Sequence, residues 1–132
     1  QMKRLDEFID KRNLLAKRYY DNLKDLKSIK CPNKYLSEAQ VNSWWHYIIT
    51  LGVEIERTDM KKFLSDLGIP TATAYSPACH EQNIFMDYSL DEYPVADNVL
   101  HRNLSLPIHV DMDLDQVDFV SESIKKYLEV IQ

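Results

Sequence analysis

The sequence predicts an α+β fold: a two-layer sandwich in which helices cover a small three-stranded sheet, with a long helix at the N-terminus. Two kinds of pattern predict it. Apolar residues recur at three- and four-residue steps near both ends of the chain, as on amphipathic helices. Short β-branched or alternating segments lie between helical ones. A chain of 132 residues corresponds to one domain, so residues 1–132 are expected to fold as a single unit.

The first helix is expected over residues 2–30, which contain neither Pro nor Gly. At 1.5 Å per residue, about 25 residues would reach about 37 Å, more than a domain this small needs to cover its core. We therefore expect the helix either to pack on a second domain or subunit, or to lie across the sheet. Its apolar stripe comprises Leu5, Phe8, Ile9, Leu15, Ala16, Tyr19, Leu23 and Leu26.

The middle of the chain predicts a connector, a strand and a helix. Residues 27–41 have the composition of a connector, and residues 43–51 are rich in the aromatic and β-branched residues that favour strands. Gly52 ends that strand. Thr58 is expected to N-cap a helix that ends near Gly68, a residue suited to the position after a helix C-terminus.

Two adjacent tryptophans mark the predicted strand. Alternation along a strand would place Trp44 and His46 on one face and Trp45 and Tyr47 on the other. One face then belongs to the core. The other must be covered by a helix or a partner domain, because a contiguous exposed aromatic patch is unusual in a monomer.

The second half predicts a short strand over residues 71–75, an irregular stretch over 76–93, a helix beginning at Pro94 and a strand over 104–108. An irregular stretch of that length is usually functional or partly disordered.

Asp113 and Gln116 have the spacing of a capping box at the start of the last helix. The apolar face of that helix is expected to contain Val117, Val120, Ile124, either Tyr127 or Leu128, and Ile131.

Composition excludes several classes of protein. The formal net charge is −5, although the first 30 residues carry nine basic and five acidic groups, so general nucleic-acid binding is not expected. No apolar run approaches the length of a membrane span, and the N-terminus is not a signal peptide. Two cysteines indicate no disulfide framework, and two glycines exclude a glycine-rich phosphate loop. We expect a reduced, cytoplasmic protein without a membrane anchor.

The candidate chemistry is sparse. Cys79 and His80 are adjacent, but sequence neighbours rarely present both side chains to one substrate, so a catalytic dyad is not expected. The four histidines do not have metal-ligand spacing. Residues 109–115 superficially resemble a calcium loop but lack its glycine and its final glutamate. We predict no catalytic residue and no metal site in this chain.

A series of short segments carries a more specific signal through its order and spacing. These segments are residues 1–9 (QMKRLDEFI) followed by Arg12, Ala16 and Tyr19-Tyr20, residues 45–49 (WHYII), Arg57, and residues 67–71 (LGIPT), 74–82 (AYSPACHEQ), 93–97 (YPVAD) and 105–109 (SLPIH). Together they resemble the C-terminal small domain of the DegT/DnrJ/StrS family, the pyridoxal-phosphate-dependent aminotransferases that act on nucleotide-linked keto-sugars.

The resemblance implies a parent enzyme that transfers an amino group from glutamate or glutamine to a nucleotide-sugar, in the synthesis of polysaccharide or antibiotic sugars. It implies that residues 1–30 form an interdomain helix, and that the partners are a large domain of the same chain and, in a homodimer, a second subunit. The large domain would carry the Schiff-base lysine and bind pyridoxal phosphate. No lysine here lies in a family-like Ser-x-x-x-Lys context, so the resemblance implies no cofactor-binding residue and no activity in this chain alone.

The resemblance also assigns candidate substrate contacts. Tyr75 and His80 match the family pattern H-Y-P-x-P-x-H-x-Q and are expected to line the sugar-nucleotide side of the cleft. The pattern's first histidine is replaced by Ala74, its first proline by Ser76 and its second by Ala78. Because that histidine lies on the substrate side, its loss leaves the substrate open.

Two other functions remain open. The basic amphipathic helix could instead serve a stand-alone interaction or dimerisation module without catalysis. The other hypothesis is a small thiol enzyme that uses Cys79 as its nucleophile.

Overall fold

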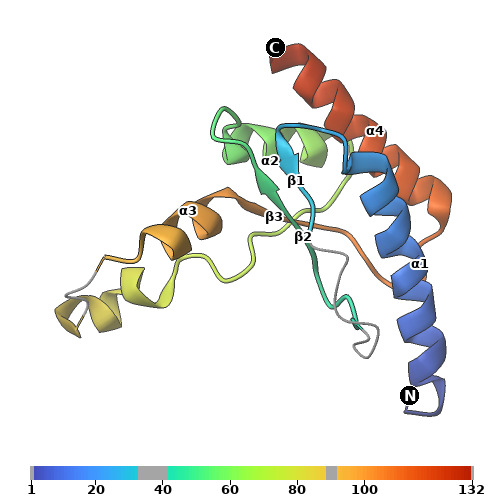
Figure 1. Cartoon of the computed structure of the whole chain (residues 1–132), viewed down its shortest axis with the longest axis horizontal. Helices are drawn as coiled ribbons and strands as arrows, with labels where there is room; N and C mark the ends of the chain where they lie inside the picture. The colour runs from blue at the N-terminus through green and yellow to red at the C-terminus, as the bar shows by residue number, and fades with distance from the viewer. Residues whose placement is uncertain (1, 33–41, 89–91, 132) are drawn as a thin grey trace.

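The computed structural model describes residues 2–32, 42–88 and 92–131, and confirms the predicted α+β class with a long N-terminal helix and a three-stranded sheet (Figure 1). The elements are η1 (Met2–Arg4), α1 (Leu5–Leu23), β1 (Ile29–Lys30), β2 (Tyr47–Leu51), α2 (Arg57–Asp66), η2 (Cys79–Glu81), η3 (Asn83–Tyr88), α3 (Pro94–Arg102), β3 (Asn103–Leu106) and α4 (Leu114–Ile131). The η elements are 3₁₀ helices. No helix in the described ranges is long and apolar enough to cross a membrane.

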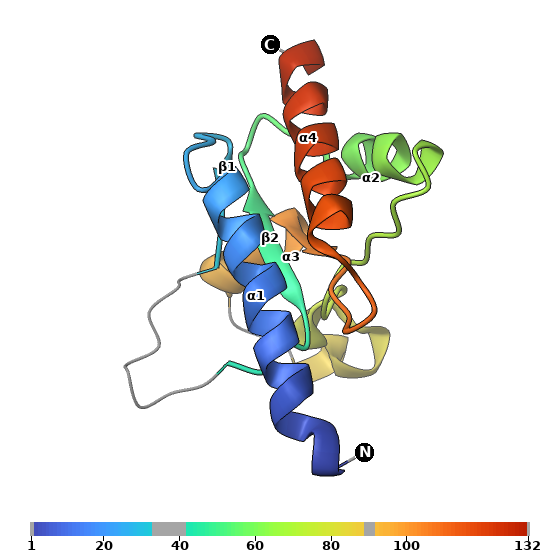
Figure 2. The same ribbon diagram turned by 90° about the vertical axis from the view of Figure 1, so that its right-hand side faces the viewer.

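The sheet is antiparallel throughout, in the order β1-β2-β3. Ile29 pairs with Leu51 across β1 and β2, and Tyr47 pairs with Leu106 across β2 and β3. Alternate residues of β2 are buried on one face, and α1, α2 and α4 cover that face (Figure 2). The core therefore lies between the sheet and one layer of three helices.

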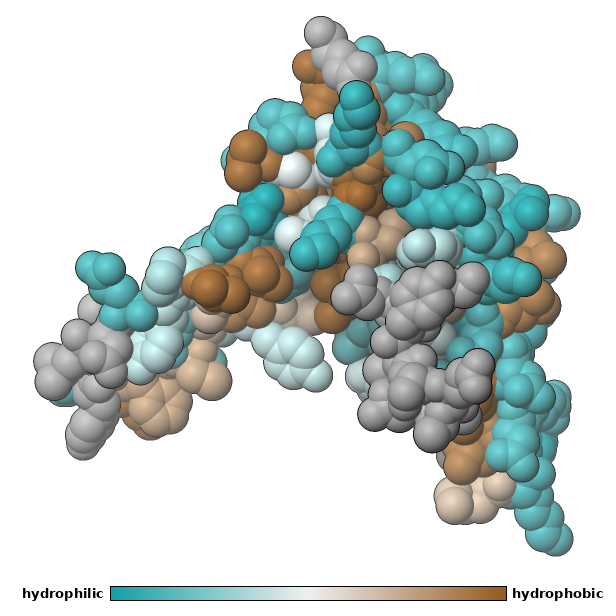
Figure 3. Space-filling view, viewed as in Figure 1, coloured by the Kyte–Doolittle hydropathy of each residue, from teal (hydrophilic) through white to brown (hydrophobic). Residues whose placement is uncertain are grey.

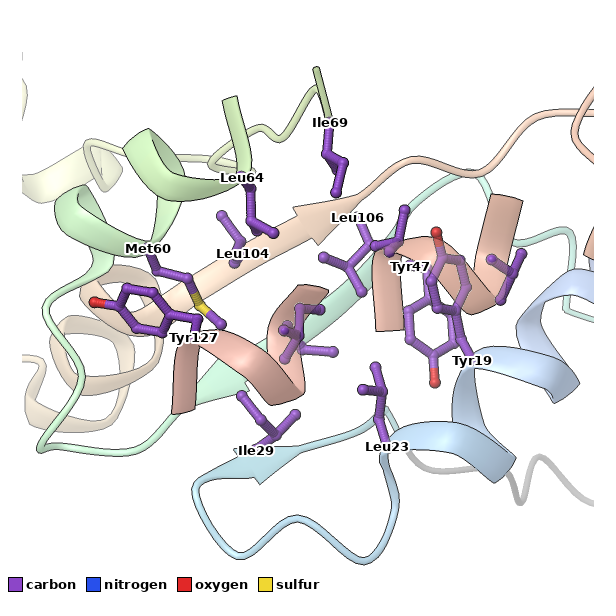
Figure 4. Close-up of a cluster of buried hydrophobic side chains, with 14 of the residues drawn as sticks. Tyr19, Leu23, Ile29, Tyr47, Met60, Leu64, Ile69, Leu104, Leu106 and Tyr127 are labelled. Carbon is purple, nitrogen blue, oxygen red and sulfur yellow. The ribbon is translucent and has the colours of Figure 1, made fainter. Parts of the chain in front are cut away.

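The side chains in this core come from every helix of that layer and from all three strands (Figure 4). Tyr19 of α1 and Tyr47 of β2 are fully buried and stacked, with ring centroids 4.9 Å apart. Burying such large rings removes much apolar surface from water and stabilises the contact between the helix layer and the sheet.

The prediction of one helix over residues 2–30 is wrong at both ends. Residues 2–4 form a 3₁₀ turn, α1 ends at Leu23, and Ile29 and Lys30 form the edge strand β1. No breaker marks this end in the sequence. Pairing with β2 buries Ile29 against the core, and that tertiary contact overrides the helical pattern. Of the predicted connector, residues 33–41 lie outside the described part of the chain.

The predicted strand at residues 71–75 is also wrong. Only Ala72 pairs with the sheet, through an isolated bridge to Ser105. The next backbone polar groups, those of Ala74, bond to the side-chain amide of Asn103 rather than to a strand. The third strand of the sheet is β1, and this segment follows the outer side of β3.

Helix α2 begins one residue before the predicted cap. Glu56, not Thr58, is the N-cap, and its carboxylate accepts a hydrogen bond from the Thr58 backbone N–H at 3.1 Å. Gly68 has φ +76°, the left-handed conformation expected after a helix C-terminus.

The capping box on α4 is confirmed. The Gln116 backbone N–H donates to Asp113 Oδ1 at 2.8 Å, and the Asp113 N–H donates to Gln116 Oε1 at 3.0 Å. The predicted apolar face is buried from Val117 to Leu128, with both Tyr127 and Leu128 buried, but Ile131 in the last turn is exposed.

The segment between Tyr75 and β3 projects from the sheet and is here called the arm (residues 75–88 and 92–102). It contains η2, η3 and α3, and α3 begins at Pro94 as predicted. No residue of α3 is buried. The molecular surface is hollowed between the arm and the N-terminal half of α1 (Figure 3).

Candidate functional site

Polar contacts hold the base of the arm against the sheet. The buried side chain of Asn103 exchanges two hydrogen bonds with the backbone of Ala74, and also donates to Leu100 O at 3.2 Å. The guanidinium of Arg57 donates to the same Leu100 oxygen at 2.6 Å. Arg57 thus caps carbonyls at the end of α3, where a cation is favoured by the helix dipole. Arg102 adds a bond to Leu51 O at 3.0 Å.

Tyr75 is the first predicted site residue and lies where the arm leaves this base. Its φ of +56° is unusual for a residue with a Cβ. Its side chain is 77% exposed, and no described residue contacts it through a hydrogen bond or a ring interaction. The backbone on its N-terminal side is fixed by Asn103, so an exposed phenol is presented from an anchored position.

His80 is the second predicted site residue. It belongs to η2, and its side chain contacts Asp97 of α3 and the preceding Tyr93. Its Nε2 lies 2.6 Å from Asp97 Oδ1, and its ring centroid lies 4.7 Å from that of Tyr93. These contacts fix the orientation of the imidazole and leave 22% of the side chain exposed. No described interaction joins His80 to Tyr75, although the two lie five residues apart on the same arm.

A second imidazole–carboxylate contact lies beside the first. Glu81 Oε1 is 2.8 Å from His101 Nε2, and Glu81 Oε2 accepts the Ala78 backbone N–H at 2.7 Å. The Ala78 N–H lowers the pKa of Glu81, and the nearby His101 adds to the effect. His80, Glu81, Asp97 and His101 therefore form one cluster of titratable side chains, which we call the arm cluster.

Sequence reasoning did not anticipate the arm cluster, because Asp97 and His101 lie 16 or more residues away from the η2 turn. The sequence offered only one signal for this cluster, the spacing of two of its residues within a single predicted helix. Asp97 and His101 are four residues apart, a spacing that places both on one face of a helix.

Cys79 lies at the start of η2 and is exposed. Its thiol forms no hydrogen bond with any described residue, and none with the neighbouring His80. The geometry therefore offers no activated thiolate.

The tryptophans do not alternate as predicted. Trp44 has φ +46° and its ring packs against Tyr47 at 5.5 Å, whereas Trp45 is 71% exposed and meets His46 edge-on at 6.0 Å. The reason is that β2 begins only at Tyr47, so residues 44–46 do not follow strand alternation.

Beside the sheet lies an open cleft of about 340 Å³ that no motif spacing predicted as a site. Trp45, His46, Thr71, Ser105 and His109 are among its lining residues. His46 Nδ1 lies 3.0 Å from Ser105 Oγ, which fixes that ring. An aromatic face, an imidazole and hydroxyls around an open cleft suit a polar ligand with a planar part. The signal for this cleft was the pair Trp45-His46 in the family-like segment WHYII.

Comparison with known proteins shows which family the chain is similar to. The DegT/DnrJ/EryC1/StrS aminotransferase family matches over residues 1–125. A curated relative, dTDP-4-dehydro-2,3,6-trideoxy-D-glucose 4-aminotransferase of Saccharopolyspora spinosa, is 31% identical over 130 residues, which are 98% of this chain and 32% of that protein.

Two solved structures have the same fold. The aminotransferase TlmJ of Streptoalloteichus hindustanus superposes with a TM-score of 0.88 at 25% identity, covering 99% of this chain and 34% of that one. PseC of Helicobacter pylori, an aminotransferase involved in the biosynthesis of pseudoaminic acid, gives 0.89 at 21% identity, covering 98% and 35%. The chain spans about a third of the length of each of these proteins. Because the family match extends over nearly all of its residues, this chain belongs to the DegT/DnrJ/EryC1/StrS aminotransferase family.

Proposed function

We propose that this chain is the C-terminal small domain of a pyridoxal-phosphate-dependent aminotransferase, which transfers an amino group from glutamate or glutamine to a nucleotide-linked keto-sugar. The observation that carries the proposal is the family match over residues 1–125 in a chain one third as long as its relatives. In the parent enzyme the domain acts as a lid that closes over the cofactor and excludes water.

The exposure of apolar residues near the start of α1 supports the proposed large domain as a packing partner. Leu15 and Leu23 of α1 are fully buried, whereas Leu5 near its start is 45% exposed and Phe8 is only half-buried. The N-terminal half of α1 extends past the sheet in Figure 1, and the apolar side chains of this half are exposed or only half-buried among the described residues. An interdomain helix would bury that half against the large domain and, in a homodimer, against a second subunit.

The lysines also support a large domain that supplies the cofactor anchor. Pyridoxal phosphate, when bound, serves as an electron sink and needs a lysine that is enclosed beside it. Every lysine in residues 2–32, 42–88 and 92–131 is exposed or half-exposed. These residues do not fit a covalent cofactor site, and we assign the anchor to the large domain.

Within the lid, we assign the substrate contacts to Tyr75 and His80. The exposed Tyr75 hydroxyl can donate to or accept from a sugar or phosphate oxygen. His80 keeps one ring nitrogen free of its bond to Asp97, and that nitrogen can contact the nucleotide portion.

The test uses the full-length enzyme with glutamate and a nucleotide-linked 4-keto-sugar. Replacing His80 with Ala should raise the KM for the sugar nucleotide about tenfold, the expected loss of one hydrogen bond to a charged partner. An unchanged KM would count against His80 as a contact. Asp97→Ala is the matched control, because it breaks the same pair and keeps the imidazole. An equal rise in both variants would mean that His80 acts only by holding the arm.

The reading frame upstream of Gln1 provides an independent test. A preceding large domain with a family-like lysine supports the proposal. A natural start at Met2 would instead favour the stand-alone interaction module.

A further inference from the structure

We propose that the arm cluster, formed by His80, Glu81, Asp97 and His101, is a binding site for a divalent transition-metal ion, namely zinc. The site goes beyond the proposed aminotransferase role, because the metal would bind this chain without cofactor or sugar nucleotide. It also departs from the expectation of no metal site, which rested on spacing along the sequence.

The first argument is geometric. One ligand atom each from His80, Glu81 and Asp97 lies within 4.8 Å of the other two, and the three residues belong to two different elements. His101 Nε2 is 2.8 Å from Glu81 Oε1 but lies outside this group of three, so its ring must turn toward the ion to supply a fourth donor. A tetrahedral zinc ion with ligand distances of about 2.0–2.2 Å needs donors about 3.3–3.6 Å apart. The donors within 4.8 Å must therefore draw together, and His80 Nε2 and Asp97 Oδ1, now 2.6 Å apart, must separate.

The second argument is the chemistry of the donors. Two imidazole nitrogens and two carboxylate oxygens form a set that suits zinc, whereas calcium and magnesium prefer oxygen ligands alone. With both imidazoles neutral, the two carboxylates carry a charge of −2, which a divalent ion neutralises. The guanidinium of the adjacent Arg102 does not compete, because it bonds to backbone oxygens of Asn98 and Leu51.

The third argument is the support around the ligands. Asp97 and His101 project from one face of α3 at an (i, i+4) spacing, the spacing of paired ligands on a helix. The second oxygen of Glu81 is held by the Ala78 N–H, and the His80 ring packs on Tyr93. Groups that orient metal ligands in this way are typical of real sites.

The cluster is also accessible. The four side chains are between 22% and 58% exposed, so an ion can enter from solvent. In the metal-free protein, each imidazole Nε2 faces a carboxylate oxygen. Metal binding would replace these two contacts with bonds to the ion and displace any proton that they hold, so the η2 turn stays tied to α3 in both states.

The experiment is equilibrium dialysis of the untagged, metal-free chain against zinc chloride, with bound zinc measured by elemental analysis. We expect one zinc ion per chain. Asp97→Asn and His101→Ala should each weaken binding at least tenfold. His109→Ala removes an exposed histidine outside the cluster, and Cys79→Ser removes the neighbouring thiol, and both should retain zinc. Circular dichroism checks that every variant is folded.

Cobalt provides a second readout, because a four-coordinate cobalt(II) site has a characteristic visible spectrum. The spectrum should form with the unmodified chain and with His109→Ala, and disappear with Asp97→Asn. The proposal is overturned if zinc binds no more tightly to the unmodified chain than to a His80→Ala/His101→Ala double variant. It is equally overturned if Cys79→Ser abolishes binding. Neither outcome bears on the KM test of the proposed function, which uses the full-length enzyme and no added zinc.

Discussion

Asn103 and Ala74 are joined by a reciprocal pair of hydrogen bonds in which a side chain takes the place of a strand. The Ala74 N–H donates to Asn103 Oδ1 at 3.1 Å, and Asn103 Nδ2 donates to Ala74 O at 2.9 Å. The primary amide of asparagine has both a donor and an acceptor, as a peptide group has. It therefore bonds to both backbone polar groups of Ala74, and the extended segment makes no further strand pair after Ala72. Tyr75, the next residue, leaves the sheet from this fixed point.

Replacing Asn103 with Ala should lower the free energy of unfolding by about 3 kcal/mol, because it removes three hydrogen bonds and leaves buried backbone groups without partners. Urea denaturation measures the change. Asn98→Ala is the control, since Asn98 is exposed on α3 and its side chain bonds to no described residue; it should change stability by less than about 0.5 kcal/mol. Equal losses in the two variants would refute the role given to Asn103.

The two stacked tyrosines of the core should differ in how much stability they lose when their hydroxyl is removed. Burial raises the pKa of both, so both are neutral at physiological pH. The Tyr19 hydroxyl donates to Pro107 O at 2.9 Å, and Tyr19→Phe should cost about 1–2 kcal/mol because that carbonyl loses its donor.

The Tyr47 hydroxyl is buried beside the weakly bonding thiol of Cys31 and has no other partner in the described residues. Tyr47→Phe should therefore leave stability within about 0.5 kcal/mol or raise it. Thermal or urea unfolding of both variants gives the comparison, and a Tyr47→Phe cost as large as that of Tyr19→Phe would contradict it.

The contact between α1 and α4 should weaken in acid. Arg18 donates two hydrogen bonds to the Asp118 carboxylate, at 2.7 and 2.6 Å, and Asn22 adds a third. The Arg18 bond is the largest of the effects that lower the pKa of Asp118 from its ordinary value of 3.8 to about 2. A lowered pKa in the folded state means that this stabilisation is complete above pH 3.8 and is lost as the pH falls toward 2.

Asp118→Asn should therefore be less stable than the unmodified chain at pH 6, and the difference should shrink between about pH 4 and 2. Urea midpoints across that range test the prediction. Asp115→Asn, in the first turn of α4 and three residues before Asp118, should give no comparable pH-dependent difference. A gap between Asp118→Asn and the parent that stays constant down to pH 2 would rule out the assignment.

Features set by neighbouring residues were predictable from the sequence. The left-handed Gly68, Pro94 at the start of α3 and the Asp113–Gln116 box all depend on local backbone geometry. Features set by distant residues were not. The end of α1 depends on pairing between residues 29 and 51, and the loss of the strand at 71–75 depends on Asn103.

The same difference between local and distant features applies to the candidate site. Tyr75 and His80 could be named as candidates from the sequence because a motif places them on one segment. The partners of His80 were not, because Asp97 and Tyr93 reach it only after the arm folds back on itself. The Trp45-His46 cleft likewise depends on where β2 begins, and alternation along the sequence does not reveal that position.

The two ends of α1 should differ sharply in their contribution to stability, and two leucines on the same helix test this. Leu15 is fully buried, so Leu15→Ala should lower the free energy of unfolding by about 3 kcal/mol through lost contacts and a cavity. Leu5 is 45% exposed, so Leu5→Ala should cost less than about 1 kcal/mol in this chain.

In the full-length protein the same Leu5→Ala substitution should become more costly, because the proposed large domain would cover the start of α1 and bury that side chain. Parallel denaturation of the chain and of the full-length protein separates the two cases, with Val53→Ala as the control: Val53 is exposed and lies in a turn far along the chain from α1. If Leu5→Ala remains as mild in the long protein as in the short one, α1 does not carry the interdomain contact, and the surface that meets the large domain must be sought elsewhere.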